Sequence, residues 1–297
     1  MPGNMTPLTF DGQVAVITGA GGGLGRCHAL EFARRGAHVV VNDVGAAIDG
    51  TAGTGSTTSA AQTVVDEITA AGGTAIAATD SVATPEGGQA IIRAAMDAFG
   101  RVDVLVNNAG ILRDAAFKNM TTRDVDPVID VHLRGAFHVT QAVWPVMREQ
   151  NYGRIVMTTS GSGLFGAFGQ ANYGAAKMGL VGLMNVLAIE GARNNIRVNA
   201  VSPIARTRMT ENTLPELVKD CEPAQVTPVV VYLAHETCTR TAHIYRIGGA
   251  HISRVFIAET AGLDDPARTP ESLARDIETI DDSAVFTIRG GPAVAAQ

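Results

Sequence analysis

TGAGGGLG at residues 18–25 follows the short apolar run QVAVIT (13–18) and leads into residues 24–35, whose apolar positions have helical spacing. A short, β-branched apolar run predicts a buried strand, and the glycines predict a tight turn from strand to helix. In such a turn, backbone N–H groups and a helix N-terminus can meet a pyrophosphate, whereas a side chain at Gly19 or Gly25 would obstruct its approach. A glycine-rich turn alone is weak support, so its place in the chain matters.

Strand and helix patterns alternate on both sides of this turn. The predicted strands are 13–18, 37–42, 74–78, 102–107, 154–159 and 196–202, with a possible seventh at 244–247; the predicted helices are 24–35, 60–71, 85–99, about 121–149 and 171–193. Alternation of this kind implies right-handed βαβ crossovers and a buried parallel sheet. We therefore predict an α/β fold: a single Rossmann-type domain with a doubly wound, mostly parallel sheet and helices on both faces.

The 297 residues show no internal repeat and no linker that would divide them into two cores. We expect one domain over residues 1–262 and a C-terminal tail over 263–297, packed on the domain or on a partner subunit. The tail is polar and irregular apart from a predicted helix at 270–280. Residues 45–59, rich in Gly, Ser, Thr and Ala, predict a flexible insertion.

Composition excludes several classes of function. Lys and Arg are scattered and the net charge is −6, which argues against nucleic acid as a partner. The three cysteines lack C-x-x-C spacing and the histidines lack ligand spacing, so we predict neither disulfides nor a metal site. The longest apolar stretch, 178–189, is too short to span a membrane, and no signal peptide is predicted. We expect a cytoplasmic protein without a membrane partner.

Asp43 ends the second predicted strand, 24 residues after Gly19. A carboxylate at this point can accept hydrogen bonds from the ribose of a dinucleotide and would repel a 2′-phosphate. Neither neighbour, Asn42 or Val44, supplies a cation. The pattern therefore favours NAD over NADP, although Arg26 or the 45–59 segment could alter this preference. The alternative is an ordinary capping or turn aspartate.

Asn107-Asn108-Ala109-Gly110 ends another predicted strand at what should be the same edge of the sheet. Its small residues would let the chain pass close to a dinucleotide, and its amides can brace neighbouring strands. As an isolated tetrapeptide it would be an ordinary turn. Its place in the strand series favours the functional interpretation.

Tyr173 and Lys177 are four residues apart at the start of a predicted helix, so their side chains face the same way. A free phenol is a poor base at neutral pH, but an ammonium and an oxidised nicotinamide nearby would lower its pKa. Tyr173 could then remove a proton as hydride leaves the substrate. Ser160, at the end of a predicted strand, could hydrogen-bond the substrate oxygen. Alone, the Tyr–Lys pair could be an ordinary helix surface.

The order TGAGGGLG, NNAG, Ser160, Tyr173-x-x-x-Lys177 and Ser202-Pro203 resembles the short-chain dehydrogenase/reductase family over residues 10 to about 255. Longer stretches, such as DAFGRVDVLVNNAGILRD (97–114), are similar to the (3R)-hydroxyacyl-CoA dehydrogenase domain of the type 2 multifunctional enzyme of β-oxidation. The resemblance implies NAD, a dimer, and catalytic roles for Ser160, Tyr173 and Lys177. The implied cofactor-binding residues are Gly19, Gly23, Leu24, Gly25, Asp43, Ser81, Val82, Asn108, Tyr173, Lys177 and Ala205.

Two departures from the family pattern affect these expectations. Many members have an Asn in a proton relay where this sequence has His132, as the multifunctional branch does; His132 could serve the relay or be a satisfied core residue. The sequence ends at Gln297, so we expect a chain without hydratase and sterol-carrier domains.

Arg206 and Arg208 could meet phosphates or simply be solvated, and 209–219 could form a lid helix.

The leading hypothesis is an NAD-dependent oxidoreductase that converts a secondary alcohol, a (3R)-hydroxyacyl-CoA, to a ketone. The alternatives are a 17β-type hydroxysteroid or steroid side-chain-CoA dehydrogenase, a 3-ketoacyl reductase, and a nucleotide-binding regulatory protein without turnover. Asp43 disfavours an NADPH-dependent reductase, and the intact Ser160, Tyr173 and Lys177 disfavour the regulatory protein. We expect a homo-oligomer, dimer or tetramer, acting on a small molecule.

Overall fold

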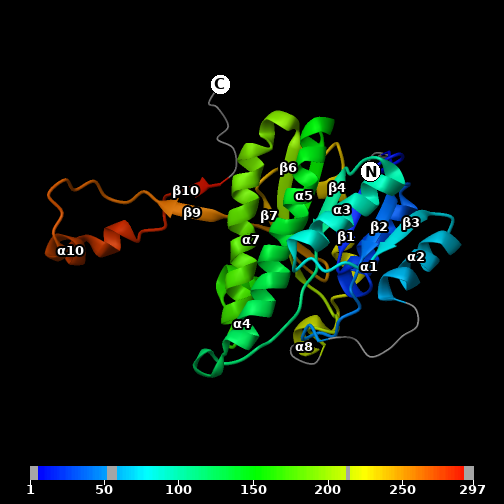
Figure 1. Ribbon diagram of the computed structural model, residues 1–297. Helices are drawn as coiled ribbons and strands as arrows, with labels where there is room; N and C mark the ends of the chain where they lie inside the picture. The colour runs from blue at the N-terminus through cyan, green and yellow to red at the C-terminus, as the bar shows by residue number, and fades with distance from the viewer. Residues whose placement is uncertain (1–5, 52–58, 212–214, 291–297) are drawn as a thin grey trace.

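The computed structural model describes residues 6–51, 59–211 and 215–290. Eight strands form one sheet in the order β3-β2-β1-β4-β5-β6-β7-β8, with helices on both faces (Figure 1). The strands are β1 (Val14–Thr18), β2 (His38–Asn42), β3 (Thr74–Ala78), β4 (Val104–Asn107), β5 (Gly153–Thr158), β6 (Ile196–Ile204), β7 (Ile244–Gly248) and β8 (His251–Val255). The main helices are α1 (Gly23–Arg34), α2 (Ala60–Ala70), α3 (Pro85–Phe99), α4 (Thr122–Ile129), α5 (Gly135–Gln150), α6 (Gly161–Phe165), α7 (Ala171–Glu190), α8 (Pro215–Val218) and α9 (Thr227–Ala234).

The core lies on both sides of this sheet. Phe32 of α1, Val64 of α2 and Val230 of α9 pack in one apolar cluster. Ile91 of α3 and Leu180 of α7 belong to the cluster on the opposite face. Because both faces of the sheet are covered, the central strands β1 and β4 are buried along their whole length and are mainly apolar rather than alternating. The predicted doubly wound α/β fold is confirmed.

Strands β1 to β7 pair in parallel, and β7 pairs with β8 in the antiparallel direction. β1 lies between β2 and β4, so the chain leaves it first toward one edge of the sheet and later toward the other. The loops after β1 and β4 consequently diverge and leave a crevice at the carboxyl ends of the strands. Crevices at this switch point are where open α/β sheets bind ligands.

The predicted helix at 121–149 is interrupted. A π-helical turn at Asp130–Arg134 separates α4 from α5. A π turn inserts one extra residue, which the apolar spacing alone does not reveal. The insertion lies where the buried His132 bonds to the backbone of Ile111 across the chain.

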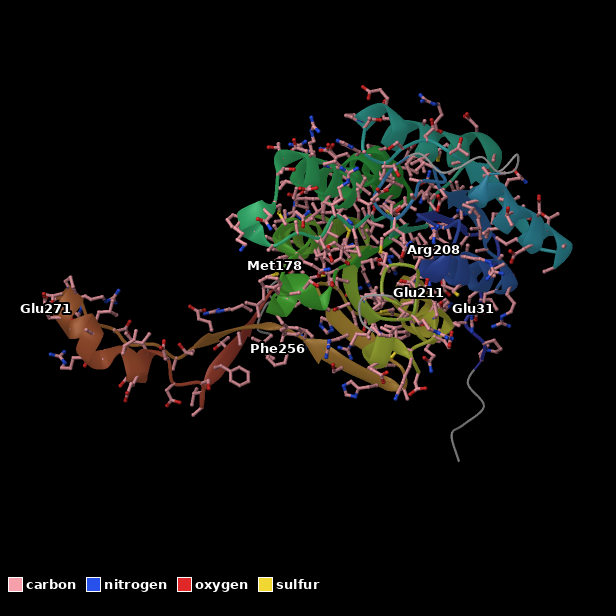
Figure 2. The ribbon with its side chains drawn as sticks, turned by 90° about the horizontal axis from the view of Figure 1, so that it is seen from below. Glu31, Met178, Arg208, Glu211, Phe256 and Glu271 are labelled. Carbon is pink, nitrogen blue, oxygen red and sulfur yellow. The ribbon has the colours of Figure 1, made fainter. Side chains whose placement is uncertain are left out.

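The C-terminal segment forms an arm that extends away from the body (Figure 1). Strand β9 (Ile257–Thr260) pairs with β10 (Phe286–Arg289), and α10 (Pro270–Ile280) lies between them in sequence. The predicted helix at 270–280 is confirmed, whereas the pair of strands is a correction to the irregular tail that was expected. Residues on both sides of the predicted boundary at 262 belong to this arm. Figure 2 shows Phe256 where the arm leaves the body and Glu271 on its helix.

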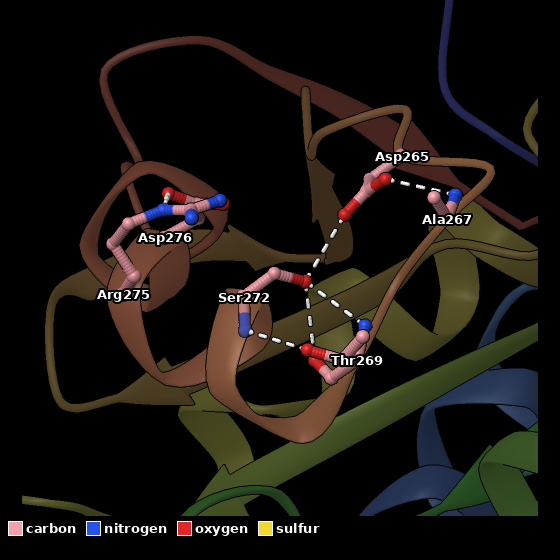
Figure 3. A network of polar contacts seen from close by, with 6 residues as sticks. All are labelled: Asp265, Ala267, Thr269, Ser272, Arg275 and Asp276. Atoms are coloured by element: carbon pink, nitrogen blue, oxygen red, sulfur yellow. Dashed lines mark hydrogen bonds and ion pairs between the residues drawn. The ribbon is translucent and has the colours of Figure 1, made fainter.

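The arm's helix is capped by its own residues (Figure 3). The Thr269 hydroxyl accepts a bond from the Ser272 backbone N–H at 3.1 Å, and the Ser272 hydroxyl accepts one from the Thr269 N–H at 3.0 Å. Ser272 also donates to Asp265 at 3.1 Å. This reciprocal capping satisfies the first N–H groups of α10 without help from the body.

Candidate active site

A cavity of about 670 Å³ lies at the carboxyl ends of the parallel strands. Its volume is that of an ordinary small-molecule site. The predicted site residues that line it are Gly19, Gly23, Leu24, Asp43, Ser81, Val82, Asn108, Ser160, Tyr173, Lys177 and Ala205. Gly25 is the one predicted residue outside the lining. Residues separated by nearly two hundred positions in the sequence therefore meet in one pocket.

The glycine turn is tightly packed against its surroundings. Gly19 has φ +63°, in the left-handed region that favours glycine. A Cβ on Gly25 would lie 2.3 Å from the Gly19 carbonyl oxygen and 2.7 Å from Nδ2 of Asn108. The close packing at Gly25 therefore leaves no room for a side chain in the first turn of α1, which begins at Gly23. The first N–H groups of α1 have no side-chain cap from Gly22, which suits the approach of an anion.

Asn108 holds the end of β4 to the same turn. Its Nδ2 donates to the carbonyl oxygens of Thr18 at 2.9 Å and Gly19 at 3.0 Å. The Asn108 backbone N–H donates to the Thr18 hydroxyl at 3.0 Å. The Asn108 side chain therefore holds the glycine turn in place. Asn108 and Ala109 both line the cavity.

Asp43 directly follows the carboxyl end of β2 and lies beside the glycine turn. Its two carboxylate oxygens accept bonds from the N–H groups of Gly21 at 2.9 Å and Gly45 at 2.7 Å. Each carboxylate oxygen can accept more than one bond, so Asp43 retains capacity for a ligand hydroxyl. Arg26, which could have offset the negative charge, is bound to Glu67 through Nε and Nη2 and does not line the cavity.

Ser160 follows β5, and Tyr173 and Lys177 lie in the first two turns of α7. The Lys177 Nζ donates to the Thr158 carbonyl oxygen at 2.6 Å and lies 5.5 Å from the centre of the Tyr173 ring. The Ser160 hydroxyl lies close enough to the Tyr173 phenol to lower the pKa of that phenol. The Ser160 hydroxyl also caps α6 by accepting a bond from the Ser162 N–H at 3.2 Å. The structure therefore brings the three predicted residues together.

Burial changes the protonation of this group. It raises the pKa of the Tyr173 phenol above its ordinary value, against a lowering by the Ser160 hydroxyl. It also lowers the pKa of Lys177 to about 7. The same burial disfavours the charged form of both residues. The expected lowering of the tyrosine pKa involves a bound nicotinamide as well as Lys177, so it stays a prediction. A positive ligand beside the phenol would be needed to reverse the direction.

His132 packs against the tyrosine from the π-helical turn. Its ring meets the Tyr173 ring edge-on, with centroids 5.1 Å apart. Its Nε2 lies 3.0 Å from the Ile111 nitrogen and 2.8 Å from the Ile111 oxygen, while Nδ1 is buried without a partner in the described part of the chain. Burial, reinforced by Lys177, holds the pKa of His132 well below its ordinary value. This direction favours the neutral form of the His132 ring, and both of its expected roles stay open.

Sequence patterns missed several polar residues of the pocket, among them Ser162, Gln170 and Arg246. Ser162 donates to Gln170 at 2.6 Å, and Gln170 donates to Asp114 at 2.7 Å, which links the serine end of the pocket to its rim. Arg246 reaches the pocket from β7. None of these residues belongs to a short motif. Only the placement of Arg246 on the last parallel strand could have indicated it.

The segment after β6 differs from the expected lid. Its described part contains only the four-residue helix α8, and residues 212–214 lie outside the described residues, as do residues 52–58 of the expected insertion. Arg206 pairs with Glu222 away from the pocket, whereas Arg208 lines it near Gly22. In the described ranges we find no helix suited to crossing a membrane and no cluster of three or more potential metal ligands.

A crevice at the switch point of the sheet that contains a Ser–Tyr–Lys group is typical of an oxidoreductase acting on CH–OH groups. Comparison with known proteins gives the family. The chain belongs to the short-chain dehydrogenase family, described as "short chain dehydrogenase", whose sequence model matches residues 13–217. Members of this family typically bind a nicotinamide cofactor.

Three relatives show which members of the family this chain is similar to. The chain is 49% identical to the mouse peroxisomal multifunctional enzyme type 2 over 93% of its own length, but it spans only 38% of that enzyme. It is 52% identical to a Mycobacterium tuberculosis protein described as a short-chain type dehydrogenase/reductase, with 91% and 94% of the two chains covered. A 3-oxoacyl-[acyl-carrier-protein] reductase of Synechocystis is 39% identical over 84% of this chain and 99% of its own.

A solved structure agrees with these relatives. Full-length peroxisomal multifunctional enzyme type 2 of Drosophila melanogaster superimposes with a TM-score of 0.78 at 41% identity, and the match covers 96% of this chain and 48% of that one. The predicted resemblance is confirmed at the level of the family and of this branch.

Proposed function

We propose that this protein oxidises a (3R)-hydroxyacyl-CoA to the 3-oxoacyl-CoA with NAD. The observation that carries the proposal is the pocket itself, which joins Ser160, Tyr173 and Lys177 at one end to the glycine turn and Asp43 at the other. Similarity to the multifunctional enzymes supports the acyl-CoA substrate.

The choice of NAD rests on charge. The Asp43 carboxylate would repel a 2′-phosphate, and Arg26, the basic residue nearest in sequence to the turn, is occupied by Glu67. The pocket fits a dinucleotide, because the glycine turn leaves the N-terminus of α1 uncapped and open to a pyrophosphate. Arg208 also lines the pocket, near Gly22, and would place a positive charge beside the pyrophosphate.

Three side chains perform the proton chemistry in this proposal. When bound, oxidised nicotinamide supplies the hydride acceptor and a positive charge. Tyr173 takes the proton from the alcohol oxygen, and Ser160 donates a hydrogen bond to that oxygen as it becomes a carbonyl. The charged form of Lys177, whose Nζ lies 5.5 Å from the centre of the Tyr173 ring, stabilises the phenolate. His132 packs on the tyrosine and limits its movement.

We also propose that the protein works as a homo-oligomer in the cytoplasm. The arm exposes Leu273, Ile277 and Phe286 to solvent, and α10 buries none of its residues against the body. An amphipathic helix without a buried face gains stability by packing on another subunit. The cytoplasmic location stays a prediction, and the multifunctional relatives are named as peroxisomal.

A substrate screen tests the proposed activity. The formation of NADH is followed with (3R)- and (3S)-hydroxyacyl-CoA, a 17β-hydroxysteroid and a steroid side-chain hydroxyacyl-CoA, each with NAD and with NADP. We expect the highest kcat/KM for the (3R)-hydroxyacyl-CoA with NAD. Turnover of the free steroid alone would overturn the substrate, and a preference for NADP would overturn the cofactor and favour a 3-ketoacyl reductase.

A further inference from the structure

One cation in the pocket has no part in the proton chemistry. Arg246 lies on β7, lines the cavity, and pairs in register with Ser202 of β6. Its guanidinium carbon lies 5.7 Å from the centre of the Phe165 ring, in the short helix that follows Ser160. Arg246 therefore lines the pocket from the β7 side, near the helix that follows Ser160.

The side chain of Arg246 is unpaired. Its Nε is buried without a hydrogen-bond partner, and no carboxylate among residues 6–51, 59–211 and 215–290 forms an ion pair with it. Arg26, Arg101 and Arg206, by contrast, each bind a carboxylate. A partly buried cation without a partner is costly, because it loses hydration without compensation. The Phe165 ring face offsets only part of that cost.

The dinucleotide cannot supply the missing partner at its pyrophosphate. The glycine turn follows β1, and β7 lies four strand positions away in the sheet order. At the ordinary spacing of strands this separation is roughly 19 Å. Arg208, which lies near Gly22, is the arginine placed to meet the pyrophosphate.

We propose that Arg246 binds an anionic oxygen group of the alcohol substrate, a carboxylate or a phosphate, and so selects charged substrates over neutral ones. This inference rests on the proposed function, because the charged groups of the proposed acyl-CoA substrate are the phosphates of CoA, whereas a carboxylate would belong to a free hydroxy acid. A free hydroxysteroid has no such group, so Arg246 also separates the acyl-CoA substrate from the neutral steroid. Charge-assisted bonds to planar oxyanions are those that arginine forms best.

The test compares Arg246→Gln and Arg246→Lys with Arg254→Gln as a matched control. Arg254 is exposed on the adjacent strand β8 and also lies near a phenylalanine ring, 5.9 Å from the centre of Phe256, but it does not line the pocket. Three forms of one 3-hydroxy acid serve as probes: the CoA thioester, the N-acetylcysteamine thioester without phosphate or carboxylate, and the free acid. NADH titration by fluorescence checks that the cofactor site is intact.

Loss of one charge-assisted bond predicts that Arg246→Gln raises KM for the charged probe about 10- to 100-fold. We expect kcat within about twofold of wild type, partial rescue by lysine, and no change with the neutral thioester or in Arg254→Gln. A loss confined to the CoA thioester identifies a phosphate, and a loss with the free acid identifies a carboxylate. An equal loss with all three probes, or none with any charged probe, overturns the proposal.

A binding measurement separates this inference from the proposed activity. The CoA thioester is titrated into the complex of enzyme and NADH, which requires no turnover. Failure of wild type to oxidise any 3-hydroxy probe refutes the proposed function, while weaker binding to Arg246→Gln than to wild type still supports anion recognition. Equal binding by the two proteins refutes the role of Arg246 whether or not turnover occurs.

Discussion

Replacement of Gly25 by alanine tests how the glycine turn makes a dinucleotide site. The added Cβ would lie 2.3 Å from the Gly19 carbonyl oxygen, 2.7 Å from the Asn108 amide nitrogen and 2.8 Å from the Ala20 Cα. Ordinary contacts are longer, so the turn must move by roughly 1 Å. Two of the three atoms belong to the backbone and cannot rotate away. The displacement therefore falls on the part of the turn that faces the cavity.

Overpacking of this kind costs about 1–3 kcal/mol of folding stability. Misplacement by about 1 Å at a preorganised site costs on the order of 100-fold in function. We expect Gly25→Ala to fold, to unfold at lower urea concentration, and to bind NADH about 10- to 100-fold more weakly in a fluorescence titration. Because Gly25 does not line the cavity, the loss would act through Gly19 and Asn108.

Gly182→Ala is the matched control. Gly182 is exposed in α7, and an added Cβ would have no atom within 4 Å. Alanine in a helix is about 0.5–1 kcal/mol more favourable than glycine. This variant should be slightly more stable and bind NADH as wild type does. Wild-type NADH affinity in Gly25→Ala would refute the reasoning about the turn.

Three further predictions concern charge, burial and assembly. Asp43→Ser should weaken NAD binding about tenfold and reduce the preference for NAD over NADP in paired titrations, and an unchanged preference would contradict the role of the carboxylate. Burial lowers the pKa of His28 to about 3. Between pH 6.5 and pH 3 the unfolded state therefore binds one proton more at this residue than the folded state does. The free energy of unfolding consequently falls by about 1.4 kcal/mol for each pH unit of acidification in this range. His28→Asn should flatten this slope in urea unfolding at pH 7 and pH 5, and equal slopes would count against it. Replacing Leu273 and Ile277 together by aspartate should yield smaller species in sedimentation velocity, and an unchanged assembly would exclude the exposed face of α10 as a subunit contact.

The fold could be predicted largely because its strands are buried on both faces. QVAVIT and the other short apolar runs have no amphipathic alternative, and glycines or polar residues mark their ends. The predicted strands 13–18 and 37–42 therefore correspond closely to β1 and β2. The candidate site followed from the same rule, since strand ends in a parallel sheet share one edge.

Other elements depend on contacts that a local pattern does not contain. TPVVVYLA is rich in β-branched residues and is typical of a strand, yet it forms α9 because its valines pack in the cluster with α1. The bond between His28 and Thr227, 2.9 Å long, joins the same two helices. β8 is short and largely exposed, so it lacks the apolar signal of the central strands. The π turn at His132 likewise depends on the backbone of Ile111.

The protonation of the site was the least predictable feature. Spacing alone places Lys177 beside Tyr173, but it does not show that Lys177 is buried or that its amine bonds to Thr158. Without a bound nicotinamide, burial raises the pKa of the Tyr173 phenol. A pKa in a pocket depends on everything that replaces water around the group, which no short motif specifies.

Replacement of Tyr173 by phenylalanine tests the central claim, because it removes one hydroxyl and keeps the ring that packs on His132. The measurement is single-turnover formation of NADH from the (3R)-hydroxyacyl-CoA, alongside the NADH dissociation constant. We expect the rate to fall by about 10²- to 10⁴-fold, as for loss of a general base, with the dissociation constant within about twofold of wild type. A variant that forms NADH at the wild-type rate would contradict the account.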